Sequence, residues 1–496
     1  MAEKSSTWKV LSIAFLVMAV HNAALHPWFL DDAFISFRYA ENFALGRGLV
    51  YNAGEKVEGY TCFLWVVLLA LGRRVGWDIV VSSKLLGTLF SVGCILLVAY
   101  AYRFVQDLNR KVCLIATVLL GTCGIFTPWA TSGMEMTMFT FLVLLSTLVY
   151  LSARGQGGSN LRLGLVGLIS AALTMTRPEG LMIFAILFAD QVVASIRKRR
   201  AGVFFLLVPF LALFLPYFLW RYSYYGYLLP NTFYAKVGPT LYQVVRGARY
   251  TVRFAGPALL LLVPVLDSTL FSHRWFRRYR RLNLLLVTAG AYTLYIILVG
   301  GDNLPAYRFF VPVLPLLALI SAAAIALRTK TKKAVVFIVT VIAVYNIVQM
   351  RIDSEIYEYI MSDMVGVSGK EVGLWFRANV PPDTVIATNS AGSLAYYSKL
   401  KTIDMLGLND THIAHLKVPS LGTGQGGHEK HDGDYVLSRQ PDYILFGPSP
   451  GYASPGFPGD LEIYRNPIFR EQYKFEVHRL SRGEVLMVYH RVIRNN

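Results

Sequence analysis

The chain has 496 residues, of which 55% are apolar and only 16% are charged, and its mean hydropathy is +0.46. This composition excludes an ordinary soluble domain and predicts many membrane spans. The formal net charge of +18 could indicate nucleic-acid binding. We exclude that reading because the basic residues form short clusters between apolar runs, the distribution that membrane topology requires.

Apolar runs long enough for membrane spans, about 20 residues each, follow one another through the first 350 residues. The N-terminal run could be a cleaved signal peptide, but similar runs follow it, so we interpret it as an uncleaved span. The stretch 63–76 is short and carries Arg73 and Arg74, so we interpret it as an interfacial helix. We predict about eleven spans, near residues 10–28, 80–104, 112–129, 135–152, 162–176, 180–196, 202–220, 252–267, 283–300, 309–327 and 334–350.

Clusters of Lys and Arg indicate which loops face the cytoplasm. With the N-terminus inside, all dense clusters fall on the inner side, including those at 197–200, 274–281 and 328–333. Acidic residues gather in the opposite loops. Because carboxylates contribute little to orientation, we infer that polar chemistry takes place at the outer face. The pattern predicts a multi-pass protein of a bacterial inner membrane, with a cytoplasmic N-terminus and an extracytoplasmic C-terminal segment.

The composition changes near residue 351, where apolar spans stop and a soluble pattern begins. We expect an α-helical polytopic membrane protein with a transmembrane catalytic domain at 1–350, whose first outer loop is 29–79. Residues 351–496 should form an extracytoplasmic soluble α/β domain of ordinary size. Its predicted elements are helices at 370–379 and 390–397, short strands at 384–388, 401–404 and 442–446, and a hairpin of 473–480 with 484–492.

The first outer loop begins with two adjacent carboxylates, Asp31 and Asp32, directly after a predicted span. Partial desolvation at the membrane edge and repulsion between the two charges both raise a pKa, which suits a general base. Arg38 follows shortly after, near enough in the fold to contact a phosphate. The alternative is that the two aspartates only cap a helix and mark an interface.

Other outer loops carry ionisable and polar residues at the ends of predicted spans, where such groups are costly and often functional. Arg177, Lys236 and Arg308 supply the cations that a lipid phosphate needs. Each residue could instead be an interfacial anchor or a member of an arginine–carboxylate pair. The remaining candidates for substrate binding are Glu58, Glu179, Asn231 and Asp302.

Two patterns in the C-terminal segment look like known site motifs. Residues 422–427 fit G-x-G-x-x-G, but they do not join a strand to a helix, so we predict a flexible loop. Histidines would suit zinc, but no cysteine accompanies them, and the four cysteines of the chain show no metal spacing. We favour a loop lining an acceptor groove and expect no cofactor, with a divalent metal as the alternative. The histidine-rich region contains His412, His415, His428, His431, Asp432 and Asp434.

The complete first loop resembles one group of membrane enzymes. It reads DDAFISFRYAEN at 31–42, GRGLVYN at 46–52 and VEGYT at 57–61. On these residues the chain resembles the GT-C superfamily of integral-membrane glycosyltransferases, and most of all the branch with the mycobacterial terminal arabinofuranosyltransferases. The resemblance covers nearly the whole chain, and further similar segments are TRPEG (176–180), LPNTFYAK (229–236), GGDN (300–303) and IDMLGLND (403–410).

The resemblance implies a multi-span body, an acidic motif in the first outer loop, usually a soluble outer domain, and a lipid-linked sugar donor. The paired aspartates of the branch map onto Asp31 and Asp32. One of them is expected to deprotonate the acceptor hydroxyl or to orient donor and acceptor. The chain is shorter than the mycobacterial enzymes, chiefly in the outer domain, which leaves the acceptor and the sugar open.

We therefore expect a glycosyltransferase that moves a sugar, with arabinofuranose as one candidate, from a polyprenyl-phosphate donor. The acceptor would be a cell-envelope glycan or lipid on the outer face, and membrane lipids would be the other partners. One alternative is a glycolipid transporter or flippase, which would more naturally carry mid-span ionisable residues and matched repeats. The other is a different envelope polysaccharide transferase with the same topology and another donor.

Overall fold

The computed structural model describes residues 2–24, 28–154, 159–198, 202–353 and 364–492. Its contacts divide the chain into two compact units. The first unit contains Met1–Pro27, Lys84–Trp220 and Gly247–Ile360. The second contains Trp28–Ser83, Arg221–Arg246 and Met361–Asn496, so the first outer loop belongs to the same unit as the C-terminal residues.

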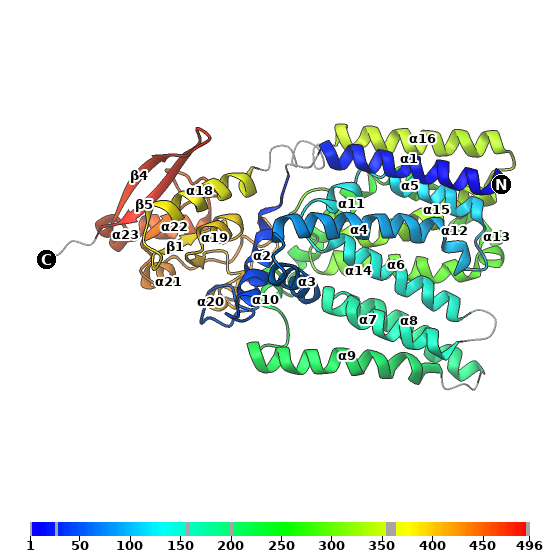
Figure 1. Ribbon diagram of the computed structural model, residues 1–496, viewed down its shortest axis with the longest axis horizontal. Helices are drawn as coiled ribbons and strands as arrows, with labels where there is room; N and C mark the ends of the chain where they lie inside the picture. The colour runs from blue at the N-terminus through cyan, green and yellow to red at the C-terminus, as the bar shows by residue number, and fades with distance from the viewer. Residues whose placement is uncertain (1, 25–27, 155–158, 199–201, 354–363, 493–496) are drawn as a thin grey trace. The chain divides into compact units, whose positions relative to one another are not determined.

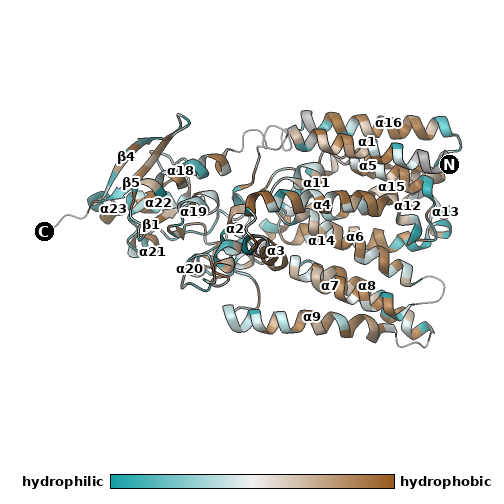
Figure 2. Ribbon diagram, viewed as in Figure 1, coloured by the Kyte–Doolittle hydropathy of each residue, from teal (hydrophilic) through white to brown (hydrophobic). Residues whose placement is uncertain are grey.

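The first unit consists of long apolar helices, which run side by side in Figure 1 and are mostly hydrophobic in Figure 2. Helices α4, α9 and α11 each have residues in both units. The helices are α1 (Ala2–Ala24), α4 (Ile79–Ala99), α5 (Arg110–Gly121), α6 (Met136–Ala153), α7 (Asn160–Thr176), α8 (Gly180–Lys198), α9 (Gly202–Tyr225), α11 (Leu241–Ala255), α12 (Leu259–Phe271), α13 (His273–Arg278), α14 (Asn283–Leu298), α15 (Leu314–Arg328) and α16 (Lys332–Ile352). Short 3-10 turns are η1 (Ala101–Arg103), η2 (Thr127–Ala130), η3 (Arg280–Leu282) and η4 (Arg308–Val313).

Every predicted apolar run contains a helix, and the chain is a membrane protein. Among the described residues, seven helices are long and apolar enough to cross a membrane, or eight if α11 and α12 form one span. Helix α5 has twelve residues and is shorter than a span needs. The run at 252–267 is not one straight span, because α11 and α12 meet there at 97°. Gly256 and Pro257 lie in the break, and proline weakens a helix there because it lacks the backbone N–H that the helix interior uses.

Burial separates the central helices of this unit from its surface helices. In the apolar segments of η4–α15 and α6, 89% and 78% of the residues are buried, whereas in α16 and α9 only 11% and 17% are. A helix that is apolar all round yet mostly exposed needs an apolar solvent. The outer faces of α9 and α16 therefore contact lipid.

The second unit contains a five-stranded sheet in the order β2-β1-β3-β5-β4. β1 pairs in parallel with β2 and β3, and β5 pairs antiparallel with β3 and β4. The predicted strands and the terminal hairpin are confirmed within one or two residues. The strands are β1 (Val385–Thr388), β2 (Lys401–Asp404), β3 (Tyr443–Leu445), β4 (Tyr473–Arg479) and β5 (Val485–Arg491).

Helices complete the second unit. Helix α18 begins five residues before the predicted start at 370, and α19 begins at Ser393 rather than at 390. Helix α3 confirms the short helix predicted at 63–76, within the first outer loop. The helices are α2 (Asp31–Ala44), α3 (Phe63–Arg74), α10 (Asn231–Lys236), α18 (Val365–Asn379), α19 (Ser393–Ser398), α20 (Thr411–Ala414), α21 (Gly433–Ser438), α22 (Pro458–Arg465) and α23 (Pro467–Gln472).

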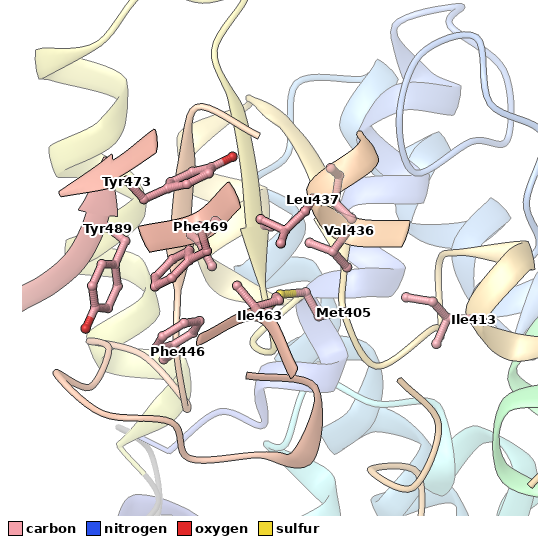
Figure 3. Packing of buried hydrophobic residues seen from close by; sticks show 12 residues of the cluster. Met405, Ile413, Val436, Leu437, Phe446, Ile463, Phe469, Tyr473 and Tyr489 are labelled. Carbon is pink, nitrogen blue, oxygen red and sulfur yellow. The ribbon is translucent and has the colours of Figure 1, made fainter. Parts of the chain in front are cut away.

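The sheet is covered on both faces because alternate strand residues point to opposite sides. On β1, Ala387 joins one core cluster and Ile386 the other; on β3, Ile444 and Leu445 divide in the same way. Figure 3 shows the first cluster, in which Phe446, Phe469 and other side chains pack together. This two-sided core holds the loops at the strand ends, which supply part of the candidate site.

Candidate active site

The two aspartates of the first loop occupy the first turn of α2, where negative charge stabilises a helix. Asp31 makes no cap for its own helix, whose N-cap residue is Leu30. Its carboxylate instead accepts hydrogen bonds from the backbone N–H groups of Gly392 (3.1 Å) and Ser393 (2.8 Å) and from the Ser393 hydroxyl (2.6 Å). Asp31 therefore caps α19, which explains why that helix begins at Ser393.

Glycine at position 392 allows this close approach. A Cβ atom there would lie 2.0 Å from the backbone oxygen of Asp31, far inside any real contact. Burial raises the pKa of the Asp31 carboxyl, against the effect of the hydrogen bonds from Ser393, and the charge of Asp32 acts in the same direction as burial. With both oxygens engaged, the Asp31 carboxylate holds α2 against the C-terminal residues.

Asp32 differs from its neighbour in its contacts, because among the described residues its carboxylate accepts no hydrogen bond. Its side chain is 30% exposed. Among the described residues, the one charged partner recorded for its carboxylate is Lys236, whose Nζ lies 3.9 Å from Oδ2. A half-exposed pair at this separation interacts weakly. Asp32 and Lys236 therefore form a partly exposed pair of a carboxylate and an ammonium group.

Asn231 fixes the helix that presents Lys236. Its side-chain amide donates to the carbonyl oxygens of Gly407, Leu408 and Asp410 at 2.9, 3.0 and 3.2 Å. Its backbone N–H donates to the Glu58 carbonyl at 2.9 Å. The structure thus uses the Asn231 amide to join α10 to the loop after β2, one turn before Lys236.

Arg38 is buried, and its guanidinium donates hydrogen bonds to other groups of the protein. It donates to the carbonyl oxygens of Tyr51 (2.7 Å), Leu400 (2.7 Å) and Ala395, and to the Asn52 side chain (3.0 Å). A guanidinium has five N–H donors, so little capacity is left for a phosphate. Arg38 joins α2 and the first loop to the segment between α19 and β2.

Glu58 is likewise engaged. Two guanidinium nitrogens of Arg221 lie close to the Glu58 carboxylate, at 2.9 Å (Nε to Oε1) and 2.6 Å (Nη2 to Oε2). Both side chains are buried. Arg221 also donates to the carbonyl oxygens of Tyr227 and Leu228. Sequence reasoning missed Arg221 because it lies near the end of the apolar helix α9.

The remaining candidates lie in the first unit and form a buried network. Arg177 contacts two carboxylates, those of Glu135 and Glu179, the latter at 2.8 Å. Arg308 holds Asp302 through two nitrogens, at 2.6 and 2.9 Å. Phe309 lies between the two cations, with its ring centroid 5.6 Å from the Arg177 Cζ and 5.1 Å from that of Arg308. Three carboxylates thus oppose two guanidinium groups.

The backbone that leads to Arg308 is strained. Ala306 and Tyr307 are consecutive non-glycine residues with φ values of 51° and 49°. Each such residue costs roughly 1–3 kcal/mol and persists only where its surroundings enforce it. The Tyr250 hydroxyl, which accepts from the Phe309 N–H at 3.4 Å, is one such contact. The network therefore has a fixed shape that the chain maintains at a cost.

The histidines of the C-terminal region separate into different settings. His412 pairs with Asp432 at 2.7 Å and His431 with Glu462 at 3.0 Å. His415 stacks on Tyr234, with centroids 4.2 Å apart. Within the described part of the chain, no three His, Cys, Asp or Glu side chains gather as a metal site. The expectation of no metal remains a prediction.

Comparison with known proteins places these features in context. Residues 354–489 match a family described as a domain of unknown function, DUF8728. The chain is 30% identical over 223 residues to the terminal β-(1→2)-arabinofuranosyltransferase of Mycobacterium tuberculosis. The aligned region is 42% of this chain and 35% of that protein. It is 28% identical over 334 residues to the enzyme of the same name from Corynebacterium glutamicum. This aligned region is 59% of the chain and 48% of that protein. The chain thus spans half or less of the length of these relatives.

The structure is similar to the crystal structure of ArnT from Cupriavidus metallidurans bound to undecaprenyl phosphate. The TM-score is 0.62 at 12% identity, and the match covers 98% of both chains. The chain has the GT-C fold. At this identity the likeness concerns the fold alone, and it includes both the helical body and the C-terminal sheet. The GT-C fold that the residues of the first loop led us to expect is therefore confirmed.

Proposed function

We propose that this protein is a glycosyltransferase that moves a sugar from a polyprenyl-phosphate donor to a cell-envelope glycan or lipid. The observation that carries the proposal is the difference between the paired aspartates. Asp31 is engaged by Ser393 and Gly392, whereas Asp32 stays accessible beside Lys236. An accessible carboxylate next to a cation suits a reaction in which a proton leaves a hydroxyl and negative charge develops on a phosphate.

In the proposed reaction, Asp32 accepts the proton of an acceptor hydroxyl as its oxygen forms a bond to the anomeric carbon of the sugar. The bond from that carbon to the phosphate oxygen breaks, and polyprenyl phosphate leaves with the bonding electrons. A phosphate is a good leaving group, so no general acid is required. Lys236 stabilises the charge on the departing phosphate.

The lipid donor and the outer-face location support each other. Nucleotide sugars are confined to the cytosol, so a transferase that acts outside needs a membrane-borne donor. The basic loops favour a cytoplasmic N-terminus and an extracytoplasmic C-terminal region. The names of the two bacterial relatives support arabinofuranose as a candidate sugar, and the undecaprenyl phosphate bound to ArnT supports a polyprenyl carrier.

The proposal is tested by incubating the purified full-length protein with a panel of polyprenyl-phosphate sugars, arabinofuranose included, and membrane glycan acceptors. Release of polyprenyl phosphate together with a glycosylated acceptor is expected for one donor, and EDTA should leave the rate unchanged. Movement of an intact glycolipid across liposomes without any transfer would instead support a transporter and overturn the proposal. Activity lost in EDTA and restored by a divalent ion would revive a metal requirement.

Replacing Lys236 by Gln should raise the KM for the lipid donor roughly 10- to 100-fold, because a hydrogen bond to a charged group contributes about 1.5–3 kcal/mol. The KM for the acceptor should change little. Donor titrations with the full-length protein measure the effect. The control is Lys417→Gln, which removes an exposed lysine of the same unit. An unchanged donor KM in Lys236→Gln would remove Lys236 from the phosphate site.

A further inference from the structure

The glycine-rich segment 422–427 has a defined conformation, which Glu429 organises. One oxygen of the Glu429 carboxylate accepts hydrogen bonds from the N–H groups of Gly422 (2.6 Å) and Gly424 (2.9 Å). The other oxygen pairs with Arg246 at 2.8 Å. A buried carboxylate with these three partners gives the loop one shape. The sequence pattern alone predicted a flexible loop, because it contains no sign of these contacts.

This loop lies directly against Lys236. Gly427 has a φ of +79°, and a Cβ atom at this position would be 3.0 Å from the Lys236 Cε and 3.4 Å from its Cγ. Positive φ and this close contact both favour glycine. The loop therefore packs on the aliphatic part of Lys236. The next residue, His428, is near enough for the charges of Lys236 and Asp32 to act on its ring.

The His428 ring is held by two contacts. Its Nδ1 lies 3.1 Å from the carbonyl oxygen of Gly426, and its ring stacks on Phe457 with centroids 5.3 Å apart. A carbonyl oxygen only accepts, so this contact assigns the proton to Nδ1. In the neutral ring, Nε2 then carries a lone pair. No hydrogen-bond partner of Nε2 occurs among the described residues.

The surroundings of the His428 ring favour its neutral form. Burial lowers the pKa of His428, and the positive charge of Lys236 on α10 acts in the same direction. The hydrogen bond with the Gly426 carbonyl raises the pKa, as do the negative charges of Asp32 on α2 and of Glu429 on the loop, without reversing the effect of burial. Because the ordinary pKa of histidine is about 6.5, the ring is an acceptor of hydrogen bonds at neutral pH.

We propose that His428 belongs to the active site and that its Nε2 accepts a hydrogen bond from a hydroxyl of the sugar acceptor. The inference rests on the proposed function and assigns one subsite within it. A neutral nitrogen lone pair attracts hydroxyl groups and repels an anionic phosphate, so the ligand is the hydroxyl-rich acceptor rather than the donor phosphate. His428 thereby holds the acceptor beside Asp32, which takes the proton, while Lys236 faces the phosphate.

Two substitutions at this position separate the role of Nε2 from that of Nδ1. Asparagine places its polar atoms near the Nδ1 position and keeps the contact with Gly426, but it lacks an acceptor at Nε2. Glutamine reaches the Nε2 position and can accept there. The control is His478→Asn, which changes a histidine of strand β4 in the same unit.

In the full-length protein, His428→Asn should lower kcat/KM for the acceptor roughly 2- to 10-fold, since one hydrogen bond contributes about 0.5–1.5 kcal/mol. The donor KM should be unchanged, and His428→Gln should recover part of the loss. In the wild type, kcat/KM for the acceptor should fall as pH drops through a value below 6.5, and this limb should be missing in His428→Asn. The thermal midpoints of both variants report whether they are folded.

The outcomes distinguish this inference from the proposed function. Wild-type transfer with an unchanged acceptor kcat/KM and pH profile in His428→Asn would overturn the role of His428 and leave the transferase assignment standing. An effect on the donor KM alone would also overturn it. Wild-type protein without transfer from any donor would overturn the proposed function, and the assignment of His428 with it.

Discussion

Replacing Asp32 by asparagine should lower kcat for sugar transfer by about 10²- to 10⁴-fold, the range that a general base contributes. Asparagine has nearly the shape of aspartate but cannot accept a proton in the reaction. The Asp32 carboxylate is accessible and only weakly paired with Lys236, so the thermal midpoint should be unchanged. Single-turnover measurements with the productive lipid donor give the rate of the chemical step.

Asp31→Asn is the matched control, because the two residues are adjacent and differ in their contacts. In the wild type, the Asp31 carboxylate accepts three hydrogen bonds from Gly392 and Ser393. Asp31→Asn weakens these contacts, so this variant should unfold at a lower temperature. Any loss of activity in it should accompany that loss of stability. Wild-type kcat in Asp32→Asn would remove Asp32 as the base, and a stable but inactive Asp31→Asn would assign the base to Asp31.

Replacing Arg177 by methionine should destabilise the protein by about 3–5 kcal/mol, because the change leaves the Glu135 and Glu179 carboxylates buried without their shared cation. The measurement is the thermal midpoint of the purified protein in detergent. We expect a loss of stability large enough to reduce the yield of folded protein.

The control for this prediction removes the charges together. Arg177→Met combined with Glu135→Gln and Glu179→Gln leaves no unpaired ion and should recover much of the lost stability, as replaced buried ion pairs often do. The donor KM of this triple variant then reports whether Arg177 has a second role at a phosphate. A wild-type midpoint in Arg177→Met alone would contradict the structural role assigned here.

The sequence predicted those parts of the fold that depend on local patterns. Helices such as α6 and α9 follow continuous apolar runs, and β2 was predicted at its observed bounds. Helix α11 was missed as an element because Arg246, Arg249 and Arg253 interrupt its apolar residues. The apolar residues of α11 lie on one face of the helix. A search for continuous apolar runs does not detect such a pattern.

The candidate site could be predicted as a set of residue types but not as a set of roles. The adjacent aspartates were visible in the first loop, yet their different contacts depend on Ser393, 362 residues away from Asp31. Arg38 was expected at a phosphate because charge suggests ligands, whereas backbone carbonyls, which no sequence pattern reveals, surround it. His428 was grouped with other histidines in a loop expected to line an acceptor groove, with a metal site as the alternative. Its position near Lys236 was not predicted, because Lys236 lies in a distant segment of the chain.

The contact between Asp31 and Ser393 also sets an order of events during biosynthesis. A ribosome that adds about 5–20 residues per second needs roughly 20 to 70 s to pass from the first of these residues to the second. During that interval the helices between them are made and inserted, while the acidic pair has no helix to cap. The acidic pair therefore stays unassembled while the helices between the two residues are made. The contacts of Asp31 form only after Gly392 and Ser393 have been made and the second unit has folded.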